Sequence, residues 1–332
     1  MKWPKIAFLH GRPGPHWAHG AFARALDAEF TYIDTYARWH DRADWAPIRY
    51  AKWLVNALAF PYRKYEVLFV EGPHVWPPFG AKFLGHHPCY ALIGNETAYF
   101  LWSGYLKGLS RWGLLESIAR YTGLFIIGHV QARMLKSLLA QKMPPYWILY
   151  NGVSDKYLAE NRSSLFLDRP VVLLIAHGPG GWRTYYKGLD LWVETIQRAA
   201  RQVKGLEGWV VGRWEEAEKV RLLEAFPEAP VRFLGAMEDM ASVFSQVSLY
   251  LHLGRGEAWG IAILEAMAAG IPSIVSEWTG AREAVEQVWP EGVVPLSAEK
   301  AAEAVVRYFN LSEAEKKILS ENSATLIREK YR

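Results

Sequence analysis

The chain has 332 residues, of which 51% are hydrophobic and 22% charged, which is enough apolar material for two folded domains and too much for a disordered chain. A single cysteine excludes a disulfide framework and a cysteine-based metal ribbon, and no stretch reaches the ~18 consecutive apolar residues of a membrane helix. The net charge of +4 conceals an asymmetry: residues 1–150 hold 17 Lys and Arg against 9 Asp and Glu, which leaves 21 against 25 for residues 151–332. This split predicts two domains with different partners in a reducing, cytoplasmic setting.

Short apolar runs alternate with helical stretches along the first half of the chain. The run over residues 5–9 ends at a loop rich in glycine and proline and predicts a buried strand, which a helix over residues 21–30 follows. Further strands are predicted at residues 67–70, 90–93 and 124–127, and a further helix around residues 114–121. Strands that alternate with helices indicate a parallel α/β sheet.

The same alternation restarts after a polar, weakly patterned segment at residues 153–169, which we interpret as a linker. Strands are predicted at residues 171–175, 208–211, 231–234, 247–251 and 271–276, and helices at 189–201, 215–225, 261–269 and from 298 to the end. The sequence therefore predicts an α/β chain with Rossmann-like domains over residues 1–152 and 170–310 and a C-terminal helix over residues 311–332.

Nucleotide and metal motifs are incomplete in this sequence. Gly178-Pro-Gly180 follows a strand, but Arg183 takes the third glycine position of a dinucleotide fingerprint, and the chain has no P-loop, His-Glu-x-x-His or Asp-x-Asp motif. Ten histidines are present, yet pairs such as His16 and His19 lack carboxylate or cysteine partners at the spacing of a zinc site. We therefore expect no metal site and no resident cofactor.

The segment from Glu257 to Pro272 combines a helix signal with two carboxylates. Gly260 begins the predicted helix and Gly270 ends it, and between them Glu265 interrupts an otherwise apolar, buried surface. Because an unpaired buried carboxylate is costly, we expect Glu265 to bind either a partner in its own domain or ligand hydroxyls. Glu257 precedes the helix, at the carboxyl end of a strand, where open α/β sheets bind ligands. The N-terminus of the helix suits a phosphate.

Glu257 and Glu265 form a Glu-x7-Glu motif that resembles the donor-site signature of retaining family 4 glycosyltransferases with the GT-B fold. The resemblance covers most of the chain and includes four further motifs: Tyr150-Asn-Gly-Val153, Lys187-Gly188, Trp209-Val-Val-Gly-Arg213 and Val231-Arg-Phe-Leu-Gly235. It implies two Rossmann-like domains that face a cleft, with the C-terminal helices packed back toward the N-terminal domain. It also implies an enzyme of the hexosyltransferase kind that uses a nucleotide-diphospho-sugar as substrate.

The resemblance assigns a role to individual residues. Glu257 resembles the family glutamate that contacts donor sugar hydroxyls, and Glu265 the one that binds the ribose. Lys187 matches the lysine that holds the leaving diphosphate, with Arg183 as its partner, and Asn95 lies near the position of a family histidine beside the reacting sugar. The remaining donor-binding candidates are Gly212, Arg213, Met237, Trp259, Gly260 and Ile261. The implied mechanism retains the anomeric configuration, and the departing phosphate takes the proton of the acceptor.

The first domain is the expected acceptor domain. In the loop after its first strand, Gly11, Arg12, His16 and His19 either contact acceptor or diphosphate or form a structural turn. Residues 36–65 interleave basic and aromatic side chains, which suits either an anionic membrane surface or packing within the domain. The first reading predicts peripheral binding to the inner face of a membrane. We expect no nucleic acid partner, because the basic excess is modest and no nucleic-acid module signature occurs.

Three functions fit these observations. The principal hypothesis is a retaining glycosyltransferase that moves a sugar from a nucleotide-activated donor to a lipid-linked or polysaccharide acceptor. A catalytically silent GT-B protein that binds a nucleotide sugar is a second hypothesis, and a sugar-nucleotide epimerase of similar fold is a third. The sequence leaves the sugar, the nucleotide, the acceptor, the linkage and the oligomeric state open.

Overall fold

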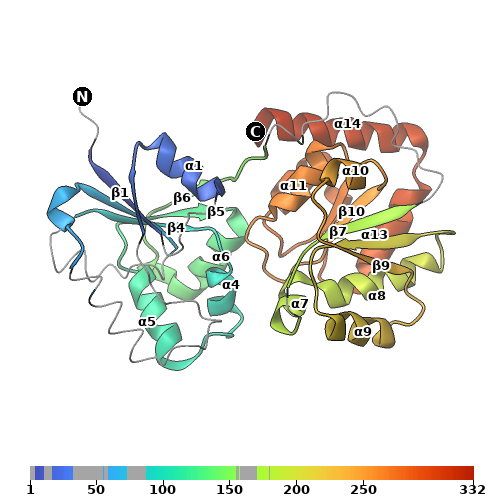
Figure 1. Cartoon of the computed structure of the whole chain (residues 1–332), viewed down its shortest axis with the longest axis horizontal. Helices are drawn as coiled ribbons and strands as arrows, with labels where there is room; N and C mark the ends of the chain where they lie inside the picture. Colours follow the sequence, from blue (N-terminus) through green and yellow to red (C-terminus); the bar gives the residue numbers. More distant parts are fainter. Residues whose placement is uncertain are drawn as a thin grey trace. The chain divides into compact units, whose positions relative to one another are not determined.

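A computed structural model describes residues 4–10, 17–32, 55, 59–72, 87–154, 157, 170–178 and 180–332. The chain divides into two compact units, Met1–Leu149 and Tyr150–Arg332. Figure 1 shows that each unit consists of a sheet with helices against it. Most of the predicted linker at residues 153–169 lies outside the described residues, and residues 150–154 belong to the second unit.

The first unit contains a six-stranded parallel sheet with the strand order β2-β1-β3-β4-β5-β6. Its strands are β1 (Ile6–His10), β2 (Glu29–Tyr32), β3 (Val67–Glu71), β4 (Cys89–Ile93), β5 (Gly123–Ile127) and β6 (Tyr146–Leu149). Its helices are α1 (Trp17–Ala25), η1 (Tyr62–Lys64), α4 (Thr97–Trp102), α5 (Gly108–Ile118), α6 (His129–Leu139) and η2 (Ala140–Lys142). The strands β1, β3, β4 and β5 lie within one residue of their predicted limits.

The sequence-based prediction placed a helix over residues 21–30, and this was wrong at its C-terminal end. The helix α1 ends at Ala25, and residues 29–32 form the edge strand β2 instead. Asp27, in the turn between them, adopts a positive φ of 51°. The two edge strands, β2 and β6, were not predicted. Their residues are partly exposed and lack the continuous apolar run of the central strands.

The second unit contains a second six-stranded parallel sheet, with the order β12-β11-β10-β7-β8-β9. Its strands are β7 (Val171–Ile175), β8 (Glu207–Val211), β9 (Val231–Gly235), β10 (Leu249–His252), β11 (Ser273–Ser276) and β12 (Val293–Val294). Its helices are α7 (Trp182–Lys187), α8 (Leu189–Ala200), α9 (Glu216–Ala225), α10 (Met240–Phe244), α11 (Ile261–Ala268), α12 (Arg282–Val288), η4 (Pro290–Gly292), α13 (Ala298–Asn310) and α14 (Glu313–Lys330). The predicted α/β class and the pair of Rossmann-like domains are confirmed.

Amphipathic patterning determines how the helices of the second unit pack. In α8 the buried positions Leu189, Trp192, Val193 and Ile196 recur at helical spacing, and this face packs against α13 in the main core of the unit. The helix α14 begins with a capping box between Ser312 and Glu315 and packs on α11 and α12. Figure 1 shows α11 and α14 on one side of this sheet and α8 on the other.

Each sheet contains a point at which the strand order reverses. In the first sheet the chain runs from β1 outward to β2 and then crosses back to β3, on the other side of β1. In the second sheet it runs from β7 through β8 to β9 and returns to β10, on the other side of β7. Loops that leave the carboxyl ends of the two strands at such a point diverge, and the crevice between them is where open α/β sheets bind ligands.

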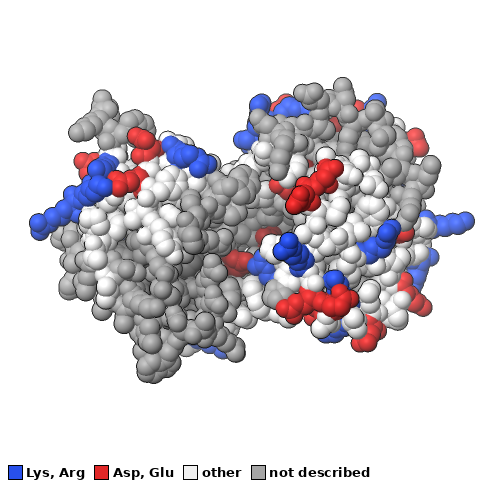
Figure 2. Space-filling model, viewed as in Figure 1, with Lys and Arg blue, Asp and Glu red and all other residues white. Residues whose placement is uncertain are grey.

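Charges of both signs lie together on the second unit. On the face drawn in Figure 2, Lys and Arg side chains are interspersed with Asp and Glu side chains. The small negative net charge of residues 151–332 therefore does not produce a field of one sign on this face. Binding of an anion to this unit must depend on local cations.

Candidate functional site

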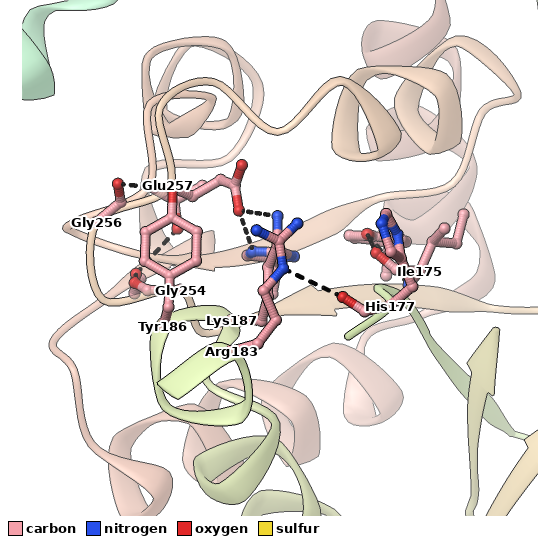
Figure 3. A network of polar contacts seen from close by, with 12 residues as sticks. Ile175, His177, Arg183, Tyr186, Lys187, Gly254, Gly256 and Glu257 are labelled. Carbon is pink, nitrogen blue, oxygen red and sulfur yellow. Dashed lines mark hydrogen bonds and ion pairs between the residues drawn. The ribbon is translucent and has the colours of Figure 1, made fainter. Parts of the chain in front are cut away.

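The reversal point of the second sheet brings together two segments about 70 residues apart in the sequence. The strand β7 leads through residues 176–181 into α7, and β10 leads through residues 253–260 into α11. Lys187 ends α7, and Glu257 lies in the second segment. Their side chains form an ion pair between Lys187 Nζ and Glu257 Oε2. Figure 3 shows this pair and the residues around it.

The helix α7 places two cations on one face. Arg183 and Lys187 are four residues apart, which corresponds to about one helical turn. The sequence analysis predicted no helix here, because α7 has only six residues and begins at the positive-φ residue Gly181. Arg183 Nε donates to the carbonyl oxygen of His177 at 3.3 Å, and its guanidinium lies over the rings of Trp182 and Tyr186. The structure therefore brings both predicted diphosphate ligands to the same helix.

Glu257 is a buried carboxylate, and its side chain is 11% exposed. Burial by itself disfavours its ionised form, but the positive charge of Lys187 and the polar contact with His252 outweigh this effect and hold the pKa of Glu257 well below its ordinary value. His252 Nε2 lies 3.5 Å from the same oxygen, Oε2, that contacts Lys187. The carboxylate is therefore charged at neutral pH and fixed through one of its two oxygens.

The other oxygen, Oε1, is available for a ligand. Among the described residues no hydrogen bond or ion pair to Oε1 occurs, and it is not among the buried polar atoms that lack a partner, so it retains contact with solvent. In Figure 3 this oxygen points away from the two interactions drawn at Oε2. A carboxylate oxygen in this position can accept a hydrogen bond from a ligand hydroxyl.

His252 was missed by the sequence analysis, which ended the predicted strand at residue 251 and gave His252 no role. It is the last residue of β10 and is 2% exposed. Burial lowers the pKa of His252 below its ordinary value, although Glu257 acts in the opposite direction. The imidazole is therefore neutral at pH 7. A polar residue at the end of an apolar strand, a few residues before a glutamate, was the signal that could have revealed it.

A second set of contacts ties α7 and the start of α8 to the segment that carries Glu257. Arg255 makes two parallel bonds of 2.8 Å to Asp190, one from each terminal nitrogen, and its guanidinium lies 3.8 Å from the ring centre of Tyr185. Its backbone N–H donates to the carbonyl oxygen of Tyr186 at 3.0 Å, and the Tyr186 hydroxyl donates to the carbonyl oxygen of Gly256 at 3.2 Å. None of these contacts was predicted. They fix the position of Lys187 relative to Glu257.

Gly188 allows the two segments to approach closely. It adopts a φ of +68°, ends α7, and lies so near the end of β10 that a Cβ atom would meet the carbonyl oxygen of Leu253 at 1.8 Å. No side chain can be accommodated at that distance. The Lys187-Gly188 pair noted in the sequence therefore combines a functional cation with the turn that positions it.

The helix α11 has one partly open face. Ile261, Ala262 and Glu265 are half-buried, whereas the rest of the helix is buried. The expectation that Glu265 lies on a fully buried helix was therefore wrong, because positions 261, 262 and 265 share a face that the domain leaves open. Glu265 takes part in a polar or electrostatic interaction of its own. Gly260 caps the helix in a left-handed conformation, with a φ of +82°.

Trp259 was predicted to bind the donor, and its side chain faces elsewhere. The indole is 2% exposed, donates from Nε1 to the carbonyl oxygen of Asn151 at 3.1 Å and packs between the rings of Tyr150 and Tyr331. The Tyr150 hydroxyl donates to Glu283 at 2.9 Å. The aromatic cluster thus fixes the start of the second unit to the segment that carries Glu257, and the side chain of Trp259 is not available to a ligand.

The other predicted donor residues lie at the same sheet edge. Gly212 and Arg213 follow β8, and Met237 follows β9, so they extend the row of loops that begins with α7 and Glu257. Gly212 has a φ of +131°, and a Cβ atom there would meet the carbonyl oxygen of Ala176 at 1.9 Å. Arg213 and Met237 are exposed. Glu257, Lys187, Arg183, Gly212 and Met237 are thus assembled along one edge.

The residues along this edge lie in a region that matches a known family. Residues 172–310 match the family described as glycosyl transferases group 1. The matched region thus lies within the second unit. The match spans the strands from β7 to β12 and includes Lys187, His252, Glu257 and Glu265. The resemblance seen in the sequence is therefore confirmed for the group, while the assignment to family 4 remains a prediction.

The chain is similar to curated glycosyltransferases over part of its length. The chain is 23% identical over 216 residues to N,N'-diacetylbacillosaminyl-diphospho-undecaprenol alpha-1,3-N-acetylgalactosaminyltransferase of Campylobacter jejuni, which covers 60% of this chain and 55% of the relative. It is 31% identical over 127 residues to phosphatidyl-myo-inositol mannosyltransferase of Mycolicibacterium smegmatis, covering 37% of this chain and 29% of the relative. The chain thus spans about half the length of the first relative, and less of the second.

Solved structures extend the similarity of fold beyond the residues of the family match. Sucrose-phosphate synthase from Thermosynechococcus elongatus superposes with a TM-score of 0.73 at 16% identity, over 99% of this chain and 95% of the other. HepE of Anabaena in complex with UDP and glucose gives a TM-score of 0.68 at 16% identity, again over 99% and 95%. The predicted GT-B fold is confirmed by these neighbours.

The first unit contains a hydrogen-bonded pair of polar side chains at its own reversal point. His19 Nδ1 and Glu71 Oε1 lie 2.8 Å apart, with His19 on α1 after β1 and Glu71 at the end of β3. His19 also adjoins Gly94, since a Cβ atom at Gly94 would meet its Nε2 at 2.8 Å. The partner Glu71 was not predicted. The other residues of the predicted acceptor loop, Gly11, Arg12 and His16, lie outside the described residues.

Asn95 has a local structural role. Its side-chain oxygen accepts from the backbone N–H of Thr97 at 3.1 Å at the start of α4, and its carbonyl oxygen accepts from Gln131 Nε2. It lies directly after β4, two strands away from β1, in the first unit. The structure thus places Asn95 at the carboxyl edge of the sheet, as expected from the sequence, with its amide engaged in a turn.

The sequence analysis also predicted a membrane-binding segment at residues 36–65 and the absence of a metal site. The basic and aromatic segment at residues 36–65 lies mostly outside the described residues, which include only residues 55 and 59–65 of it. Within the part of the chain that the structure describes, no helix is long and apolar enough to cross a membrane. In that same part, no three His, Cys, Asp or Glu side chains gather in a way that could hold a metal ion.

Proposed function

We propose that this protein is a retaining glycosyltransferase that transfers a sugar from a nucleotide-activated donor to a lipid-linked or polysaccharide acceptor. The observation that carries the proposal is the pairing of Glu257 with Lys187 at the reversal point of the second sheet, with Glu257 Oε1 open to a ligand. A carboxylate suited to sugar hydroxyls and a cation suited to a diphosphate lie side by side there. The group 1 family match over the same residues supports this interpretation.

In the proposed complex each group has one task. Lys187 and Arg183 bind the diphosphate and stabilise the negative charge that builds on it as the glycosidic bond breaks. Glu257 accepts a hydrogen bond from a sugar hydroxyl, and Glu265 binds the ribose. Gly212 and Met237 border the base, and the backbone of Gly260 and Ile261 faces the diphosphate. The departing phosphate takes the proton of the acceptor, and the anomeric configuration is retained.

The acceptor is assigned to the first unit, where His19 and Glu71 lie at the corresponding sheet edge. The names of the two curated relatives specify lipid-containing acceptors, a diphospho-undecaprenol and a phosphatidyl-myo-inositol. We extend this acceptor class to the present chain. Peripheral contact with an anionic cytoplasmic membrane surface through residues 36–65 would bring the enzyme to such an acceptor.

Donor hydrolysis and transfer by purified variants test the proposal. Glu257→Gln, Glu265→Gln and Lys187→Ala should each lower kcat/KM, and loss of Lys187 or Glu257 should cost about 100-fold or more, because each acts on charge or hydroxyl groups of the donor. Lys204→Ala is the matched control, since Lys204 is an exposed lysine of the same unit that lies away from the site. Full activity in all three variants would reject the assignment.

The same assay separates the two alternatives. Binding of a nucleotide sugar without turnover, with either undecaprenyl-diphosphate-linked sugars or soluble glycans as acceptor, identifies a catalytically silent binding protein. Conversion of the donor sugar in the absence of any acceptor identifies an epimerase. Transfer with retained configuration, read from the anomeric signals of the product by NMR, identifies the retaining enzyme.

A further inference from the structure

His252 lies behind the candidate catalytic carboxylate and has an unusual environment. It is 2% exposed, and within the described part of the chain neither Nδ1 nor Nε2 has a hydrogen-bond partner. Its ring stacks on that of Tyr250 two residues earlier on β10, with an angle of 5° between the planes. A buried imidazole without any hydrogen bond is costly, so packing alone does not explain why a histidine occupies this position.

The geometry around Glu257 provides an explanation for the buried histidine at position 252. His252 Nε2 lies 3.5 Å from Glu257 Oε2, slightly beyond hydrogen-bond length, and Lys187 Nζ already occupies that oxygen. Gly254 leaves the space in which the two side chains meet, because a Cβ atom there would lie 3.0 Å from His252 Nε2 and 3.1 Å from Glu257 Cβ. Lys187 and His252 therefore approach the same oxygen of Glu257.

Binding of a donor affects the contact of Lys187 with Glu257 and the contact of His252 with Glu257 differently. A diphosphate attracts the ammonium group of Lys187, which then leaves Glu257 Oε2 or shares its hydrogen bonds with the phosphate. A buried carboxylate that loses its donor becomes both less stable and less precisely oriented. His252 cannot move in the same way, because it is enclosed on the strand and stacked on Tyr250.

We propose that His252 is a positioning residue that donates from Nε2 to Glu257 Oε2 once Lys187 turns to the diphosphate, and so keeps Oε1 directed at the donor sugar. This inference rests on the proposed function. It requires the neutral tautomer with the proton on Nε2. The titratable and charged groups that face the imidazole are Glu257, Lys187 and the hydroxyl-bearing ring of Tyr250, and burial keeps the imidazole uncharged.

Two substitutions separate hydrogen bonding from packing. His252→Phe keeps an aromatic ring against Tyr250 but has no donor, whereas His252→Gln places an amide N–H near the position of Nε2. Tyr308→Phe is the matched control, since it removes another buried polar group of the same unit, the hydroxyl that donates to the carbonyl oxygen of Ser248 at 2.7 Å. Urea unfolding of all three variants reports their stability independently.

The decisive measurement is the affinity gained from the sugar. Calorimetry compares UDP with UDP-glucose, UDP-galactose and UDP-N-acetylglucosamine, and GDP with GDP-mannose. In His252→Phe the nucleotide sugar should lose about ten- to hundred-fold in affinity while the nucleotide alone changes less than twofold, and His252→Gln should recover most of the loss. Tyr308→Phe should leave the ratio of the two affinities unchanged.

Three results would contradict the inference, and they differ from failure of the proposed function. An equal loss for nucleotide and nucleotide sugar in His252→Phe indicates a structural role only. Unchanged affinities in His252→Phe, or no recovery in His252→Gln, exclude a hydrogen bond to Glu257. If the wild-type protein binds none of these nucleotides or nucleotide sugars, the donor site itself is rejected.

Discussion

Each unit of this protein places a pair of polar side chains at the same topological position, but the surroundings of the two pairs differ. Lys187 and Glu257 meet at the carboxyl ends of the neighbouring strands β7 and β10. His19 and Glu71 meet at the carboxyl ends of the neighbouring strands β1 and β3. In both units the first member follows the strand at which the chain starts its sheet, and the second follows the strand to which it returns. The doubly wound topology thus creates two equivalent positions for polar groups.

The difference lies in the support around each pair. In the second unit, Arg255, Asp190 and Tyr186 connect the two loops of the site directly, and Gly188 brings their backbones into contact. In the first unit, His19 lies against Gly94 and Gln131 donates to Asn95 nearby, and both His19 and Glu71 take part in further interactions. Preorganisation of this kind suits a site that must bind a fixed diphosphate, whereas acceptors vary between enzymes. The comparison predicts that the second unit tolerates perturbation of its site poorly.

The largest expected effect comes from the backbone of the second unit. Gly188→Ala introduces a methyl group 1.8 Å from the carbonyl oxygen of Leu253, and we expect it to lower the free energy of unfolding by about 3 kcal/mol and to abolish donor binding. Gly205→Ala is the control, because Gly205 has a similar φ of +73° with no atom within 4 Å of its Cβ position. It should cost about 1 kcal/mol. Urea unfolding measures both, and equal effects would show that the loops can separate.

An intermediate effect is expected at Arg255. Arg255→Ala removes both bonds to Asp190 and the contact with Tyr185, and should destabilise the protein by about 2 kcal/mol and lower kcat by about tenfold. Arg255→Lys should not restore activity, since an ammonium group cannot make the bidentate contact. Arg201→Ala breaks an exposed ion pair with Glu228 and should change neither quantity. Normal turnover in Arg255→Ala would mean that α7 is positioned without this contact.

The smallest effect is expected in the first unit. His19→Ala breaks the pair with Glu71 and should lower the free energy of unfolding by about 1 kcal/mol and reduce transfer to the acceptor. Nucleotide affinity should stay within twofold, because the donor site is assigned to the other unit. Lys64→Ala, which breaks an exposed pair with Glu29, serves as the control. If calorimetry shows weaker nucleotide binding in His19→Ala, the first unit contributes to the donor site and the contrast between the units fails.

Local patterning was sufficient for the central elements of the fold. The strands β7 and β3 are continuous apolar runs, and the helices α8 and α13 bury a face at regular helical spacing. The elements that were missed or misplaced, such as α7, β2 and β12, are short or lie at edges. Their conformation depends on a positive-φ glycine or on pairing with one neighbour, and neither leaves a periodic signal.

The candidate site was predictable in its charged members and not in its arrangement. Glu257 and Lys187 stand out because a resemblance to a known family connects them, and Glu265 because it interrupts an apolar helix. Nothing in the sequence indicated that Trp259 turns toward Asn151 or that Glu265 lies on an open face. Both facts depend on which side of α11 faces the rest of the domain.

By itself, the sequence determined the alternation of strands and helices, the charge difference between the halves and the residues able to bind a phosphate or a hydroxyl. These properties are local, and hydrophobic period and side-chain chemistry express them directly. Only the tertiary structure decided that Lys187 and His252 converge on one carboxylate oxygen of Glu257. That convergence follows from the reversal of strand order between β7 and β10, which brings together loops that are 70 residues apart along the chain.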